Sequence, residues 1–134
     1  MHTNLHEPTP LERAREFHRQ LLSHIPTYTG EELARLRELD PTAAAEPNRA
    51  LRDSHQIFAV PLLDTWHYPR FQFDTHGRPC PQAAELLAAL GVREDPWDML
   101  RWLVEPHPAL GDVAPVDRWE SEPERVIALA RQEH

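Results

Sequence analysis

The chain has 134 residues, which is enough for one domain whose core buries about two thirds of the surface of the unfolded chain. Its 40% hydrophobic and 27% charged residues are ordinary for a soluble protein, and no apolar run approaches the roughly 18 residues of a membrane span. The N-terminus lacks the basic start and apolar stretch of a secretory signal, so we expect a cytoplasmic protein. The net charge of −8 argues against free-standing DNA binding unless the basic residues gather on one face, because affinity for phosphates comes from Lys and Arg.

The beginning of the chain divides into a lead-in and a helix. Residues 1–10 contain prolines and no periodicity, so we expect a poorly ordered lead-in there. From Leu11 to Ile25 the apolar residues recur at steps of three and four, which predicts an amphipathic helix that ends before Pro26. Such a helix needs a partner surface for its apolar face.

Two further short helices are expected before the first strands. Thr29 and Glu32 match a capping box, which predicts a helix over residues 30–39, and a third helix is plausible around residues 46–52. Three short helices before a β-hairpin resemble a winged helix-turn-helix. We therefore interpret residues 11–55 as an N-terminal helical region of degenerate helix-turn-helix type.

A small antiparallel hairpin should follow. Residues 57–60 and 68–73 are strand-like, and residues 62–67 would join them. Pro61 and Pro69 confine these strands to edges or ends of the sheet, because proline cannot donate a hydrogen bond to the ladder.

Alternation along the second strand predicts which side chains share a face. Phe71 and Phe73 would lie on one face, with Arg70 and Gln72 on the other. A turn is expected at residues 74–77, where a glycine ends the run.

Two helices are strongly indicated next. Residues 81–90 form a helical pattern that Gly91 closes as a C-terminal cap. Asp95 is the expected N-cap of a second helix over residues 97–104, with Pro96 at its first position.

Short elements complete the chain. We expect a turn at Leu110–Gly111, a helical turn over residues 115–119, and a capping box at residues 121–124 that opens a last helix over residues 123–131. The hairpin and these helices together define a C-terminal region over residues 56–134.

The tryptophans and arginines of this region are candidates for a surface. Trp97 and Trp102 are five positions apart, about 140° around a helix, so we expect that they cannot both point at the same core. One of them would line an exposed patch, or a Trp would wedge against the neighbouring hairpin. The arginines are either solvated or bind a partner, since interfaces favour Trp, Tyr and Arg; they are Arg101, Arg118, Arg125 and Arg131.

No constellation predicts catalysis, a metal or a cofactor. Among nine histidines only His2 and His6 stand at an i,i+4 spacing, and there is no nucleotide or hydrolase motif. Asp95 and Asp98 could form an acid/base pair, but a helix start accounts for both. Cys80 precedes a helix, which could lower its pKa, or it has a structural role. We expect no enzymatic activity.

The block from Tyr68 to Asp117 alternates large aromatic residues with prolines, which builds a compact surface. With its flanks, over roughly residues 57–131, it resembles the toxin-binding domain of Xre/MbcA/ParS-like antitoxins. The sequence departs from the family at Asp112, where a second glycine is usual, and at Ala114, where a threonine is usual. The matching residues are Phe71, Gln72, Phe73, Trp97, Trp102, Pro108, Leu110, Gly111, Pro115 and Asp117.

The resemblance implies a helical toxin-binding domain that neutralises a cognate toxin, commonly a RES-domain enzyme that consumes NAD or modifies proteins with ADP-ribose. It also implies an N-terminal helix-turn-helix that binds operator DNA and forms a homodimer. The candidate partner-binding residues are Trp97, Arg101, Trp102, Leu110, Gly111, Pro115, Asp117, Arg125 and Arg131.

Two alternatives remain open. One is a divergent winged helix-turn-helix regulator of transcription, whose hairpin is the wing and whose DNA-binding candidates are Arg49 and Arg52. The other is an interaction module that serves a partner other than a toxin.

Overall fold

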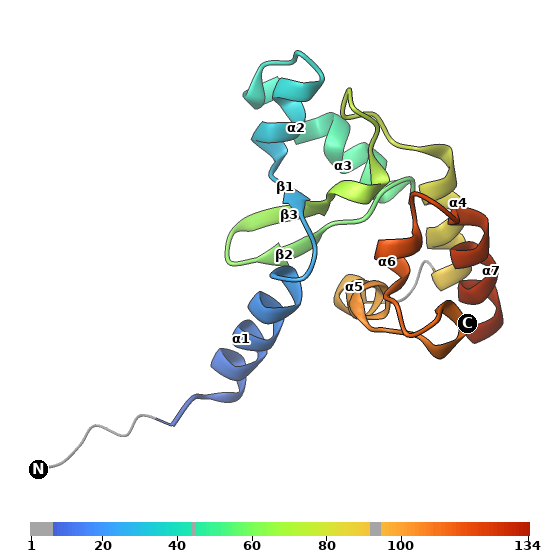
Figure 1. Cartoon of the computed structure of the whole chain (residues 1–134). Helices are drawn as coiled ribbons and strands as arrows, with labels where there is room; N and C mark the ends of the chain where they lie inside the picture. Colours follow the sequence, from blue (N-terminus) through green and yellow to red (C-terminus); the bar gives the residue numbers. More distant parts are fainter. Residues whose placement is uncertain (1–6, 44, 92–94) are drawn as a thin grey trace, which may run out of the picture.

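The structure is a computed structural model that describes residues 7–43, 45–91 and 95–134. Within these ranges the chain is mainly helical with a small antiparallel sheet, as the sequence predicts (Figure 1). The helices are α1 (Pro10–Leu22), α2 (Gly30–Leu36), α3 (Ala45–Asp53), α4 (Pro81–Leu90), α5 (Pro96–Val104), α6 (Pro115–Arg118) and α7 (Pro123–Glu133). The strands are β1 (Thr27–Tyr28), β2 (Val60–Leu62) and β3 (Thr65–Pro69). Three 3-10 turns lie at Pro41–Ala43, Arg70–Gln72 and Pro108–Leu110.

The N-terminal elements have the topology of a winged helix. The chain runs α1, β1, α2, α3 and then the hairpin β2–β3, and the sheet order is β1-β3-β2 with both pairings antiparallel. β1 is only two residues long, so no alternating run in the sequence predicted it. It pairs Thr27 with Pro69 and Tyr28 with Tyr68. The hairpin is thereby attached beside α2 and α3, in an arrangement that resembles a winged helix-turn-helix with β2–β3 in the place of the wing.

Three of the predicted helix ends are confirmed, whereas α2 ends at Leu36 instead of at residue 39. The Thr29 hydroxyl accepts a hydrogen bond from the backbone N–H of Glu32 at 3.2 Å, and the Glu32 carboxylate accepts one from the N–H of Thr29 at 2.9 Å. Asp95 accepts from the N–H of Trp97 at 2.8 Å at the start of α5. Gly91 closes α4 with a φ of 97°, a value that an L side chain rarely adopts.

One helix start differs from the prediction and one was missed. The expected capping box at the start of α7 is wrong, because the Ser121 hydroxyl donates back to the carbonyl of Arg118 and Glu122 takes the N-cap position without a side-chain bond. The start of α1 carries a box that we did not predict, between Thr9 and Glu12. α1 therefore begins at Pro10, inside the expected lead-in; residues 1–6 of that lead-in are outside the described residues.

The hairpin is confirmed, but its strands are displaced along the chain. The expected loop over residues 62–67 mostly forms strand, and the turn is confined to Leu63 and Asp64. Pro61 lies in β2 and Pro69 at the end of β3, so both occupy the edge or end positions expected for proline.

The run after β3 is a 3-10 turn instead of a strand, which overturns the predicted faces. Phe71 packs against Phe58 and Trp119 in one hydrophobic cluster, whereas Phe73 belongs to another. Gln72 is fully buried. Its side-chain amide accepts from the N–H of Phe58 at 2.7 Å and donates to the carbonyls of Phe58 and Pro69, so it joins the strand entry to the turn.

Two clusters make up the core of the described residues. The larger is built by the end of α1, by β2, and by α4, α5 and α7, with α4 packed along α7. The smaller lies under the helix-turn-helix and consists of Leu33, Ile57, Ala59, Tyr68 and Phe73.

Trp97 and Trp102 both lie in the larger cluster, which contradicts the expectation that they cannot share a core. Each is only 9% exposed. α5 is covered on several sides, so residues at different angles are all buried. The Trp97 ring stacks on His18 of α1 at 3.9 Å, and the Trp102 indole N–H donates to Glu133 near the end of α7 at 2.7 Å.

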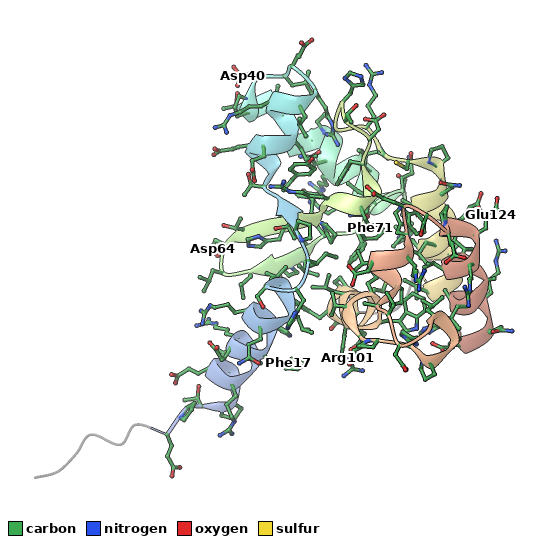
Figure 2. The ribbon with its side chains drawn as sticks, in the orientation of Figure 1. Phe17, Asp40, Asp64, Phe71, Arg101 and Glu124 are labelled. Carbon is green, nitrogen blue, oxygen red and sulfur yellow. The ribbon has the colours of Figure 1, made fainter. Side chains whose placement is uncertain are left out.

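α1 finds a partner surface only at its C-terminal end. Leu21 and Ile25 are buried, whereas Leu11 and Phe17 are 60% and 48% exposed. In Figure 1 the N-terminal part of α1 stands away from the rest of the protein, and Figure 2 labels Phe17 on it. None of the helices in the described ranges has the length and apolarity needed to cross a bilayer.

Candidate nucleic-acid interface

The second helix of the helix-turn-helix presents an exposed face. In α3 the only buried residue is Asn48, whose side-chain oxygen accepts a hydrogen bond from Arg37 of the preceding helix end. Arg37 also donates to the carbonyl of Gly77 at 2.7 Å, where a φ of 73° and the close approach of Leu36 require glycine. These contacts fix the inner side of α3. The residues on its outer side are Glu46, Pro47, Arg49, Ala50 and Asp53.

The wing lies beside α3 and carries an exposed tryptophan. The tip residues Leu63 and Asp64 are exposed, and Leu63 has a φ of 54°. Trp66 follows on β3 and is 42% exposed, although the other three tryptophans of the chain are buried. An exposed aromatic next to an exposed helix face is typical of a binding surface.

Arg52 connects the helix to the wing. Its guanidinium lies 4.4 Å from the centre of the Trp66 ring and 5.9 Å from that of Tyr68, and it donates a hydrogen bond to the Tyr68 hydroxyl. Burial raises the pKa of Tyr68, while the charge of Arg52 and its hydrogen bond act in the opposite direction. Tyr68 therefore stays neutral near neutral pH. The cation is held in place by two rings on the same face of β3.

Two grooves flank this Arg52–Trp66 contact. The first, of about 680 Å³, is bounded by the start of α2, by α3 and by the wing, and Thr29, Glu46 and Asp64 are among its lining residues. The second, of about 300 Å³, lies on the other side, toward α4 and α5. Arg49, Arg52 and Trp66 line both grooves, so these three side chains form the ridge between them.

The charges on this face are mixed. Arg49 lies 3.7 Å from Asp53, and Arg35 lies 3.8 Å from Glu31, with all four side chains largely exposed. Exposed pairs of this kind contribute little to stability, so the arginines remain available to a ligand. Glu46 and Asp64 add negative charge. The face therefore has cations at defined positions but no large positive patch.

The candidate partner-binding residues of the C-terminal half differ in their exposure. Four of them, Trp97, Trp102, Leu110 and Pro115, are buried and stabilise the core. The exposed ones are Arg101, Gly111, Asp117, Arg125 and Arg131.

Several of these exposed residues have local contacts. Arg101 pairs with Glu105 at 3.7 Å, and Arg125 donates to the carbonyl of Ala109 at 2.8 Å. Asp117 lines a cleft of about 650 Å³ between the β1 region and α6.

Trp66 was missed as a candidate. It stands two residues before Tyr68, so in a strand both rings point to one side. The spacing of Trp66 and Tyr68 did not identify Trp66, because residues 62–67 were expected to form a loop. The two DNA-binding candidates, Arg49 and Arg52, do lie together on the ridge.

The groups considered for chemistry are possible metal ligands, Cys80 and Asp95. Within residues 7–43, 45–91 and 95–134, no group of three or more His, Cys, Asp or Glu side chains is placed to hold a metal ion. Burial, with a smaller contribution from Asp74, raises the pKa of Cys80. The position of Cys80 at the N-terminus of α4 therefore does not lower the pKa of the thiol. Asp95 caps α5, as the structural interpretation of this residue predicts.

Comparison with known proteins supports the fold. No family model matches the chain, and no curated protein does. The chain is similar to Rv2175c, whose NMR structure superposes with a TM-score of 0.64 at 21% sequence identity, over 81% of each chain. A likeness at this identity concerns the arrangement of the elements alone.

Proposed function

We propose that this protein binds double-stranded DNA through α3 and the β2–β3 wing, as a winged helix-turn-helix regulator. The proposal is supported mainly by the order of the elements, α1, β1, α2, α3, β2 and β3, which is that of a winged helix. β1 adds the third strand to the sheet. In helix-turn-helix proteins the second helix enters the major groove, where its exposed side chains read the bases.

The side chains on α3 suit this role. Arg49 is exposed near the middle of the helix and can donate two hydrogen bonds to a guanine, and Ala50 beside it can contact a thymine methyl group. Arg52 is held over Trp66 at the junction of helix and wing, where it would meet a phosphate. The first groove would follow the DNA backbone between α3 and the wing.

The charge of the chain sets the expected strength. Residues 1–69 hold ten acidic and seven basic side chains, so this half is itself acidic. Non-specific attraction to phosphates is therefore weak, and binding depends on a few directed contacts. We expect binding to be selective for one sequence and to show a shallow dependence on salt, equivalent to about two or three phosphate contacts.

Selection from randomised duplexes at low salt, followed by fluorescence anisotropy with the selected duplex, tests the proposal. Arg49→Ala should weaken binding by about tenfold or more, which corresponds to the loss of one bidentate base contact. Arg101→Ala is the matched control, because Arg101 also pairs with a carboxylate four residues later at 3.7 Å but lies on α5. Failure to enrich any duplex, or equal losses for the two variants, would rule the proposal out.

A second candidate function is neutralisation of a toxin by the C-terminal half, as the resemblance to Xre/MbcA/ParS-like antitoxins implies. One observation favours it specifically. Gly111 and Asp112 have φ values of 72° and 61°, so the chain adopts a left-handed turn where the family has two glycines. The toxin would be of RES type, and the exposed Asp117 and Arg125 would contact it.

Co-expression with the neighbouring open reading frame tests this second function. We expect the two proteins to co-purify and growth to recover, and Arg125→Glu should abolish both effects. Arg35→Glu on α2 makes the same change of charge on the other half and should abolish neither. A neighbour that is harmless when expressed alone would contradict it.

A further inference from the structure

The groove behind α3 has a chemical character that the other described grooves lack. Its floor is apolar and is contributed by Ile57, Phe58, Leu87 and Met99 from the strand entry, α4 and α5. Its ionisable lining residues are Arg49, Arg52, Asp53 and His55, which leave a net positive lining when the histidine is neutral.

The contrast with the other grooves is informative because the chain as a whole carries a net charge of −8. The groove between α3 and the wing has three carboxylates against two arginines, and the cleft near α6 has three carboxylates against one arginine. Among the grooves of the described residues, the one behind α3 therefore combines an apolar floor with positive charge. Such a combination is complementary to an anion that carries an apolar body.

We propose that this groove binds a small amphipathic carboxylate, with the apolar body on the floor and the carboxylate on Arg52. Its volume of about 300 Å³ is at the lower end of the range for small-molecule sites, so the ligand is a short fatty acid or an aromatic acid. Arg52 is already oriented by the Trp66 ring, so little side-chain freedom is lost when it pairs with a carboxylate.

The position of this site links it to DNA binding. Arg49 and Arg52 line both this groove and the groove of the proposed DNA contact. A carboxylate on Arg52 neutralises a cation that DNA would use, so ligand and DNA weaken each other's binding by the same factor. This regulatory consequence rests on the proposed DNA-binding function, whereas ligand binding itself does not.

Methyl NMR on the full chain without DNA tests the site. The probes are octanoate and phenylacetate, each compared with its neutral amide. We expect the acids to shift the methyl signals of Ile57, Leu87 and Met99. The amides should bind at least about tenfold more weakly than the acids, because they lack the charge that pairs with Arg52.

Substitution of Arg52, which lines the groove, tests whether its charge binds the carboxylate. Arg52→Met keeps the apolar stem, and we expect it to lower the affinity for the acids by about tenfold or more while leaving the amides unchanged. Arg101→Met on α5 is the control and should leave both unchanged. Absence of shifts at the floor methyls, shifts spread over unrelated methyls, or equal affinity for acids and amides would each overturn the site.

The effect on DNA is measured separately, by adding octanoate to the complex with the selected duplex. Release of DNA is the expected result. If the floor methyls shift but the chain binds no duplex, the ligand site stands and the DNA-binding function fails. If DNA binds and the floor methyls never respond, the ligand site fails alone.

Discussion

The larger hydrophobic cluster gathers eighteen buried residues of the described chain, including three of the four tryptophans, whereas the smaller cluster under the helix-turn-helix has five. The aromatic block that attracts attention in the sequence thus mostly stabilises the C-terminal half. The N-terminal half has less core and leaves Trp66, Arg49 and the outer side of α3 exposed. In this protein the residues that hold the fold and the residues available to a partner are largely separate.

One cavity made in each cluster compares how much the two clusters contribute to stability. Leu100→Ala should lower the free energy of unfolding by about 2–5 kcal/mol, because Leu100 is fully buried in the larger cluster. Leu33→Ala in the smaller cluster should fall at the low end of that range, since fewer neighbours surround it. Urea denaturation measures both. A larger loss for Leu33→Ala would show that the small cluster governs stability.

The contact between the segment that enters β2 and the 3-10 turn after β3 is tested at Gln72. Gln72→Leu leaves the buried N–H and carbonyl of Phe58 without this partner, which should cost about 1–3 kcal/mol for each unsatisfied group. The same exchange at the exposed Gln82, Gln82→Leu, should change unfolding by less than about 0.5 kcal/mol. Equal thermal midpoints for the two variants would mean that Gln72 is not a structural link.

The wing offers the reverse situation, in which function is affected more than stability. Trp66→Ala should change the free energy of unfolding by less than about 1 kcal/mol, because Trp66 is partly exposed. It should nevertheless weaken binding of the selected duplex several-fold, since Arg52 loses the ring that orients it. Anisotropy and denaturation of the same sample provide the comparison, and a stable variant with unchanged affinity would remove Trp66 from the interface.

A smaller effect is expected from pH at His67 on β3. Burial lowers the pKa of His67 below its ordinary value of 6.5, so the unfolded chain takes up this proton more readily than the folded one. The neutral His67 makes its full contribution to the free energy of unfolding at pH values above the pKa of the unfolded chain. That contribution is lost as the pH falls from the pKa of the unfolded chain to the lower pKa of the folded chain. Thermal midpoints measured from about pH 7 to about pH 5 should therefore fall less steeply for His67→Gln than for the parent chain. The same dependence of the thermal midpoint on pH in both proteins would contradict a lowered pKa of His67 in the folded chain.

The smallest effect is expected at Cys80. Because burial raises its pKa, alkylation at neutral pH should be slower than for a free thiol, and Cys80→Ser should leave DNA binding unchanged. Fast modification by iodoacetamide would show that the thiol is activated after all.

The sequence predicted the elements whose signals are local. The capping box of Thr29 and Glu32, the Asp95 cap and the Gly91 end are confirmed because each depends on bonds within a few residues. The role of Gln72 could not be predicted, since two of its three hydrogen bonds are made with Phe58, fourteen residues earlier in the segment that leads into β2.

The candidate site was predicted only in part. Arg49 and Arg52 were identified because they are the bases of the expected recognition helix, and they lie together on the ridge. Trp97 and Trp102 looked separable on an isolated helix, but α1 and α7 cover α5 from different sides. Burial of that kind depends on tertiary packing, which helical periodicity does not report.

Backbone amide NMR of the full chain, titrated with the selected duplex, would show whether DNA binds to α3 and the wing. We predict that signals from α3 and from the wing around Leu63 to Trp66 shift on binding, while those of α4, α5 and α7 stay in place. Shifts concentrated on the C-terminal helices, or no shifts at a duplex excess in low salt, would contradict it.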